Sequence, residues 1–360
     1  MERRRFLAAA RTAGVCGVAG VSGCLGGSDL FETRPAATGA GGEPPLVENR
    51  PDAVYVPTHV EGTEMAGAAD VGDLKVGVMY SYPHRFWVVE KGDDDAFVAR
   101  KTAITEADSV HLMASVWDPE TGRVVPNTGL SIEISRDGAL VSQEVVYPML
   151  SQRMGFHYGA NFPLPGDGTY DVSVSVGGLD ANRFGAYEGK FGSPAEGTVR
   201  FEFSSRALND LSYRTLDERK GERAAVKPME MEAMPVGRAP ERLPGSSFER
   251  GSTGDAVFLA SVVTDERFGE DPYLAVSPRT PYNRLVIPGM ALSASADGGA
   301  SFSGSLTAGL DPDVGFHYGA PAPGLTGSET LEIAVDVPPQ VARHEGYETA
   351  FLDMPPVTLT

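Results

Sequence analysis

The chain has few cysteines, few lysines and no long apolar run, and each shortage limits what it can be. Its only cysteines among 360 residues are Cys16 and Cys24, so no disulfide framework is expected. Lysine supplies six of the 30 basic residues, against 49 acidic ones, and the net charge is −19. Nucleic acid is therefore excluded as a partner, because phosphate binding needs clustered basic residues. An acidic, lysine-poor chain is typical of a protein from a salt-loving organism, where salt screens self-repulsion.

Sequence motifs of catalysis are missing as well. The chain has no Gly-x-Ser-x-Gly, no His-Glu-x-x-His and no phosphate-binding glycine loop before a helix. We therefore expect a binding protein rather than an enzyme. Beyond the N-terminus no run of 18 or more apolar residues occurs, so the chain is expected to be tethered to a membrane rather than to span it.

Residues 1–23 are predicted to be an export signal. The run RRRFL, followed by small apolar residues, resembles a twin-arginine signal, and Val21–Cys24 resembles a lipobox. Cys24 would then be the lipidated first residue, and residues 24–52, rich in Gly, Pro, Ala and Glu, a flexible tether. These features predict export by the twin-arginine route and a lipid anchor on the outer face of the cell membrane. The alternative is a cleaved, secreted protein.

The rest of the chain is predicted to be all-β. Short alternating runs are bounded by Asp, Gly, Asn and Pro about every ten residues, which favours antiparallel β-sandwiches. We expect one sandwich over residues 53–205, a linker over 206–250 with a short helix around 209–222, and a second sandwich over 251–360. The predicted strands are Leu74–Met79, Phe86–Val89, Val110–Trp117, Leu130–Ile134, Tyr170–Val176, Val257–Val263, Leu285–Ile287, Met290–Ser295 and Leu331–Val337.

An internal repeat supports two copies of one domain. The sequence GFHYGA occurs at Gly155–Ala160 and again at Gly315–Ala320, an offset of 160. A repeat of this length indicates duplicated domains rather than a solenoid. The offset also matches Arg183, Tyr187 and Phe191 with Arg343, Tyr347 and Phe351.

The two copies differ in a complementary way. His344 of the second copy is replaced by Phe184 in the first. The first copy has residues that the second lacks: His111 and Met113 in VHLMASV, where the similar VFLASVV has Phe258 and Ala260, and Met149, which has no counterpart. Because each copy lacks side chains that the other has, the two copies are expected to share one site.

The side chains in question are metal ligands. Residues i and i+2 of a strand face the same side, so His111 and Met113 are expected to converge. Met149 precedes His157 in a segment where a strand gives way to a glycine-containing turn and loop. Imidazole together with thioether favours copper, especially Cu(I). The alternative for each residue is a core methionine or a hydrogen-bonded structural histidine.

Three segments resemble a known family. VHLMA, the Pro148–Asn161 segment with its HYGAN, and GTYDV at Gly168–Val172 are similar to periplasmic copper-binding proteins associated with ferrous iron uptake. The resemblance covers about 74–203 and, more weakly, the last 100 residues. It implies dimerising immunoglobulin-like sandwiches, copper as the bound metal with iron as an alternative, and a membrane iron permease as partner. The ligands that it implies are His111, Met149, His157 and His344.

Two departures from the family pattern bear on the metal. Met113 stands where the family has a glutamate, which removes an oxygen ligand and favours copper over iron. The segment from Met149 to His157 is one residue longer than the family spacing, so Met154 is an alternative ligand.

The remaining histidines leave alternatives open. If the copies pack as the family dimer does, His344 could complete the first copy's site, making the chain an intramolecular pseudo-dimer; a homodimer is the other arrangement. Otherwise the second copy has decayed, His344 lies on the surface and His317 is structural. His84, beside an aromatic cluster, and His317 are further candidate ligands, with turn packing as the alternative for His84 and a structural role as the alternative for His317.

The sequence thus predicts a metal-binding surface lipoprotein that assists iron or metal uptake. A tandem immunoglobulin-like interaction module with a vestigial metal site is the alternative. A solute-binding protein for a small organic ligand is a third interpretation.

Overall fold

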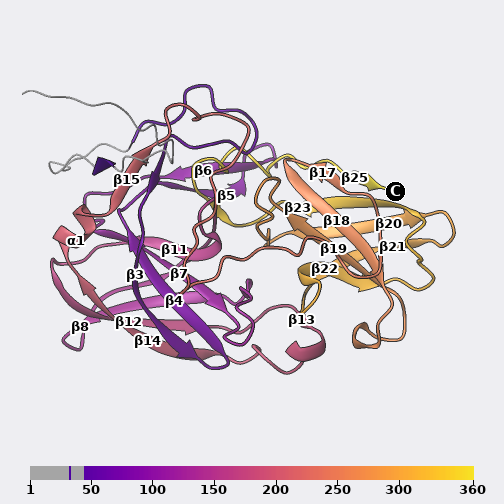
Figure 1. The fold of residues 1–360 in the computed structure, drawn as a ribbon, viewed down its shortest axis with the longest axis horizontal. Helices are drawn as coiled ribbons and strands as arrows, with labels where there is room; N and C mark the ends of the chain where they lie inside the picture. The colour runs from indigo at the N-terminus through magenta and orange to yellow at the C-terminus, as the bar shows by residue number, and fades with distance from the viewer. Residues whose placement is uncertain (1–31, 34–43) are drawn as a thin grey trace, which may run out of the picture. The chain divides into compact units, whose positions relative to one another are not determined.

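The computed structural model describes residues 32–33 and 44–360, and its compact unit runs over Glu32–Thr360 (Figure 1). The predicted signal and the lipidated Cys24 lie outside the described residues. Strands dominate the described chain, as the sequence predicts. In this part of the chain no helix is long and apolar enough to cross a membrane.

The first sandwich packs an eight-stranded sheet, of order β3-β4-β7-β11-β10-β24-β5-β6, against a four-stranded sheet, of order β14-β12-β8-β9. Its core comes from strict alternation: in β12 every second residue, from Tyr170 to Val176, is buried. The strands are β3 Glu64–Val71, β4 Leu74–Ser81, β5 Phe86–Lys91, β6 Phe97–Thr102, β7 Val110–Trp117, β8 Leu130–Arg136, β9 Ala139–Val145, β10 Tyr147–Ser151, β11 Gly155–Phe162, β12 Gly168–Val176 and β14 Ala195–Phe203.

The second sandwich is built around a long strand, β21, that takes part in both of its faces. β21 pairs with β22 through Thr307–Asp311 and with β20 through Phe302–Leu306. The strands are β16 Ser246–Ser247, β17 Gly251–Thr253, β18 Ala256–Val263, β19 Tyr273–Arg279, β20 Ala291–Asp297, β21 Phe302–Asp311, β22 Gly315–Pro321, β23 Thr330–Val337 and β25 Val357–Leu359; 3-10 turns are η1 Gly185–Tyr187 and η2 Glu266–Phe268.

The two sandwiches exchange short strands. β24 (Ala342–Arg343) of the second copy lies in the sheet of the first, parallel to β10 and antiparallel to β5. β13 (Asn182–Arg183) of the first copy pairs in the same parallel way with β21 of the second. β13 and β24 stand 160 residues apart, which is the offset of the sequence repeat, so each copy contributes the equivalent strand to the other.

Arg343 fixes the exchanged segment of the second copy. Its guanidinium is fully buried and donates to the carbonyls of Pro339, Ala350 and Phe351. Burial lowers the pKa of this group to about 9. The Arg343 side chain therefore holds the loop that follows β24 in place through hydrogen bonds to backbone carbonyls.

The expected linker has more structure than the sequence suggested. The helix predicted around 209–222 is wrong: α1 covers Ser205–Asn209, capped by the Ser204 side chain, and β15 (Ser212–Thr215) pairs with β2 (His59–Glu61) and β1 (Glu32–Thr33). Tyr213 and Thr215 favour a strand, and pairing with β1 on one side and β2 on the other overrides helix propensity.

Part of the expected tether lies against the first sandwich. The carbonyls of Pro44 and Pro45 accept hydrogen bonds from Arg85 and the Thr58 hydroxyl. Isolated bridges replace the predicted strand at Leu285–Ile287. Arg284, whose backbone is left-handed, precedes this segment and Pro288 follows it, so too few residues remain for a strand.

Candidate metal centre

Four histidines from four separate segments meet in the first sandwich. Ring nitrogens of His84, His111 and His344 all lie within 4.8 Å of one another. The ring centroid of His157 lies 5.2 Å from that of His344. His111 lies on β7, His157 on β11, His84 between β4 and β5, and His344 directly after β24. The second copy therefore supplies one member of the cluster by its exchanged strand.

None of the four Nε2 atoms has a hydrogen-bond partner among the described residues, although all four are buried. A buried polar atom left without a partner costs about 1–3 kcal/mol. Four such atoms in one place are costly for a folded protein unless a ligand accepts their lone pairs. The donor set therefore fits a bound metal ion.

Hydrogen bonds on the other ring nitrogen orient three of these imidazoles. Nδ1 of His111 donates to Oδ1 of Asn161 (2.7 Å), and Nδ1 of His157 donates to the Gly155 carbonyl (3.0 Å). Nδ1 of His84 donates to the Tyr82 carbonyl (3.0 Å). Because Nδ1 carries the proton, Nε2 keeps the lone pair that a metal requires.

Asn161 is a functional residue that the sequence reasoning did not single out. It accepts from His111, and its Nδ2 donates to the His84 carbonyl (3.0 Å), so one amide links two histidine segments. Its place on β11, directly opposite His111, was the available signal, but using it required the strand pairing.

Methionine sulfur lies beside the histidines. A Cβ on Gly159 would come within 3.0 Å of His111 Nε2 and 3.1 Å of Met149 Sδ, so only glycine leaves this space open. Met149 is opposite His157 in the β10–β11 hairpin, so His157 lies on a strand and not in the expected loop. Met113, opposite Gly159, points to the same region of the sheet.

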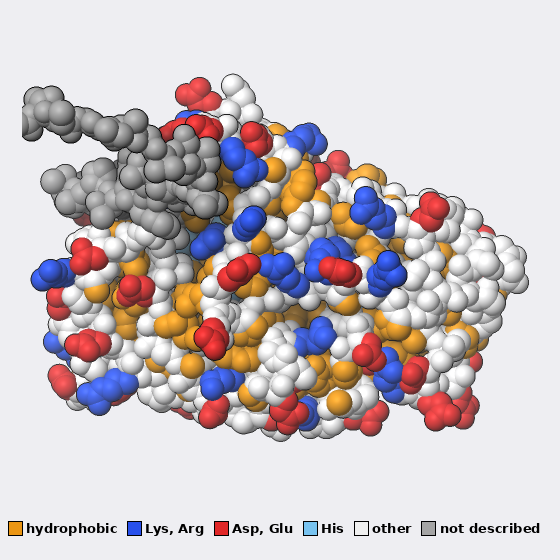
Figure 2. Space-filling view, in the orientation of Figure 1, with side chains coloured by type: hydrophobic (Ala, Val, Ile, Leu, Met, Phe, Trp, Pro, Cys, Tyr) orange, Lys and Arg blue, Asp and Glu red, His pale blue; other side chains and the backbone are white. Residues whose placement is uncertain are grey.

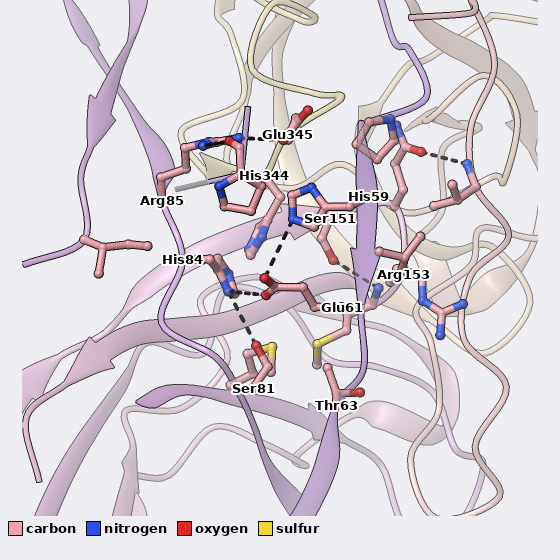
Figure 3. Close-up of a pocket in the computed structure, with 18 residues that line it drawn as sticks. His59, Glu61, Thr63, Ser81, His84, Arg85, Ser151, Arg153, His344 and Glu345 are labelled. Atoms are coloured by element: carbon pink, nitrogen blue, oxygen red, sulfur yellow. Dashed lines mark hydrogen bonds and ion pairs between the residues drawn. The ribbon is translucent and has the colours of Figure 1, made fainter. Parts of the chain in front are cut away.

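A pocket of about 130 Å³ leads to the cluster, and Figure 3 shows its side chains. Met113 and Met154 line it together with His84 and His344. The two alternative sulfur ligands therefore differ in place: Met149 lies deep, 0% exposed, and Met154 lies in the hairpin turn at the pocket wall.

The pocket also carries carboxylates. Glu61 lies between His59 and His84, 3.7 Å from Nε2 of the first and 3.6 Å from Nδ1 of the second (Figure 3). Glu345 is paired with Arg85 at 3.0 Å. A cation that approaches the histidines thus passes acidic groups, neither of which the sequence had indicated.

Burial keeps the histidines neutral. Desolvation lowers the pKa of His84 to about 3 and that of His157 to about 4. The pKa values of His111 and His344 are also lowered well below the usual range, first by desolvation and then by the neighbouring histidines. The metal-free cluster therefore holds its lone pairs available at neutral pH.

The second copy shows the same place without a site. Strand register makes Tyr273 the counterpart of His111, since β19 pairs with β22 as β7 pairs with β11. The assignment of Phe258 and Ala260 as counterparts of His111 and Met113 is therefore wrong; Ala275 replaces Met113. Gly309, opposite His317, replaces Met149.

His317 lies apart from the cluster, with both ring nitrogens engaged. Its Nδ1 donates to the Gly315 carbonyl (2.9 Å) and its Nε2 lies 3.2 Å from the Tyr273 hydroxyl. Phe184 and Phe268 pack around Tyr273 and His317. Aromatic rings thus fill the space that the histidine cluster occupies in the first copy.

Fold and site together define a duplicated β-sandwich protein with one histidine-rich centre. Residues 62–204 match the family described as Fe2+ transport protein, and residues 241–360 match a domain of unknown function. The match to the Fe2+ transport protein family thus covers the first sandwich, the part of the chain that carries the sequence resemblance. No curated protein matches the chain.

Solved structures also resemble part of the chain. FetP of uropathogenic Escherichia coli strain F11 is 17% identical, covering 39% of this chain and 96% of its own, with a TM-score of 0.28. A copper-bound variant of FetP is 18% identical over 39% of this chain and 97% of its own (TM-score 0.28). A copper-bound variant of Campylobacter jejuni P19 is 14% identical over 40% and 96% (TM-score 0.25).

Proposed function

We propose that this protein binds one copper ion at the four-histidine cluster and captures it for metal uptake at the cell surface. The observation that carries the proposal is the convergence of His84, His111 and His344, with His157 and the Met149 sulfur beside them, and a buried Nε2 without a hydrogen-bond partner on each of the four histidines. Imidazole and thioether donors favour copper over harder metals, and the thioether favours Cu(I) in particular. Iron is the alternative cargo.

The role in uptake rests on the family of the first sandwich and on the sequence of the N-terminus. The family description, Fe2+ transport protein, supports a partner in iron or metal import, for which we propose a membrane permease. The twin-arginine and lipobox sequences support an exported protein anchored through Cys24. Substitution Cys24→Ser should then move the protein from the membrane fraction to the medium; retention in the membrane would contradict the anchor.

Capture, rather than turnover, suits the surroundings of the cluster. The ligands come from rigid strands, and the described pocket is small, about 130 Å³. Such a site holds an ion and offers little room for an organic substrate. We therefore propose a binding protein and not an enzyme.

The competing function is a surface interaction module with a vestigial metal site. The second copy shows what loss of a site involves: its histidine nitrogen is paired with a tyrosine hydroxyl, and aromatic rings fill the space. The first copy has no such compensation. This contrast favours metal binding for the first copy and the vestigial interpretation for the second.

A copper titration with a matched control tests the proposal. Wild-type protein should bind one equivalent, the His111→Ala/Met149→Ala/His157→Ala variant should lose it, and His317→Ala should keep it. His157 and His317 each stand in a GFHYGA segment, so His317→Ala controls for the loss of a histidine from that segment. No stoichiometric copper in wild type, or equal loss in His317→Ala, would contradict the assignment.

A further inference from the structure

A second cleft, of about 610 Å³, opens in the other sandwich, and none of its lining residues is shared with the metal pocket. It lies between the chain around β16 to β18 and the segment that ends β19. The charged residues that line it are four arginines and one carboxylate: Arg242, Arg250, Arg279, Arg284 and Glu241. Four guanidinium groups around one cleft are unexpected in a chain with a net charge of −19.

The carboxylate does not neutralise the cleft. Glu241 pairs with Arg284 at 3.3 Å, which leaves three positive charges. Arg242 and Arg250 are exposed and make no ion pair with any carboxylate that the structure describes. Lys and Arg side chains gather over β18 and β19 on the face shown in Figure 2. Two long cationic side chains therefore remain available to a ligand.

Arg279 is the most informative member. Its side chain is 2% exposed, and its partners are neutral: the Pro240 carbonyl and the carbonyl and hydroxyl of Ser277. Burial, together with the nearby Arg284, lowers its pKa to about 10. A buried guanidinium without a carboxylate is costly, and a bound oxyanion would offset that cost.

Arg343 provides a comparison inside the same molecule. It too is buried and held by carbonyls, but it lies within a closed loop and serves that loop. Arg279 instead faces a cleft with other arginines along its wall. The structural role of Arg343 therefore does not account for the position of Arg279.

The remaining walls are mostly apolar, with the hydroxyls of Ser247 and Thr280 among them. Leu243 and Phe248 are buried, and Leu259 lines the same cleft. A cleft of this size suits a small organic molecule. Apolar walls and a guanidinium cluster together favour a ligand with both carbon surface and oxyanion groups. We propose that this cleft binds a small organic anion bearing carboxylate or phosphate groups, at a site independent of the metal centre.

Calorimetric titration of the metal-free protein at constant ionic strength tests this. The probes are citrate, for a carboxylate ligand, and glucose 6-phosphate, for a phosphate ligand. At least one should bind with a stoichiometry of one, and which one binds identifies the chemistry. The Arg242→Gln/Arg250→Gln variant should bind it at least tenfold more weakly; both positions are exposed, so the fold should be retained.

The matched control is Arg206→Gln/Arg219→Gln, which removes the same charge from exposed positions away from the cleft. It should bind as wild type does. Absence of binding by both probes at millimolar concentration would overturn the proposal. Equal weakening in the two variants would also overturn it, because only the general charge of the protein would then matter.

Discussion

Replacement of His344 by phenylalanine should change metal binding and stability in opposite directions. The substitution copies Phe184, which follows β13 in the other copy as His344 follows β24. It removes one of the four Nε2 donors, and we expect copper affinity to fall at least about 100-fold, or ~2.7 kcal/mol. It also removes a buried nitrogen that has no partner in the metal-free protein.

The stability change follows from that unpartnered atom. An unsatisfied buried polar group costs about 1–3 kcal/mol, so the metal-free variant should be more stable by about that amount. Its melting temperature should rise by a few degrees, and copper should raise it further in wild type than in the variant. The assay is thermal unfolding with and without copper, beside a copper titration.

Two results would refute this reasoning. Wild-type copper affinity in the variant would show that His344 is not a ligand. A metal-free variant less stable than wild type would show that the imidazole is held by the fold and not reserved for a ligand.

Two further outcomes are expected. The pKa values of His84 and His157 are near 6.5 in the unfolded chain but about 3 and about 4 in the folded protein. The free energy of unfolding of the metal-free protein should therefore be highest above pH 6.5 and fall by about 1.4 kcal/mol per pH unit per histidine below it, down to about pH 4. Urea unfolding between pH 7 and 4 measures this, and a flat profile would contradict the neutral cluster. The Phe184→His/Tyr273→His variant should gain a second, weaker copper equivalent by titration, and an unchanged stoichiometry would show that more than these aromatic rings prevents binding.

The sequence predicted best the strands whose ends are marked by turn residues. β7 has the predicted bounds, Val110–Trp117, because its apolar run is bounded by polar turns. The hairpin of β10 and β11 was harder, since Gly155 and Gly159 made a paired strand look like a loop. One glycine forms the turn with a φ of 68°, and the other leaves room for the His111 and Met149 side chains.

The cluster was partly predictable because the repeat carried its information. Complementary differences between the copies pointed to His344, and the strand exchange explains how that residue reaches the first sandwich. His84 could not be ranked from sequence, because it lies on no regular element and its place depends on Asn161. The counterpart of His111 was assigned wrongly from the sequence, because the segment of β18 resembles that of β7 in sequence, whereas strand pairing shows that β19 takes the place of β7.

Anomalous diffraction from crystals grown with copper tests the central claim most directly. The account predicts one copper peak per chain, within bonding distance of Nε2 atoms from both sandwiches, His344 among them, and no peak at His317. A peak bound by residues of one sandwich alone, or equal peaks at both GFHYGA segments, would contradict it.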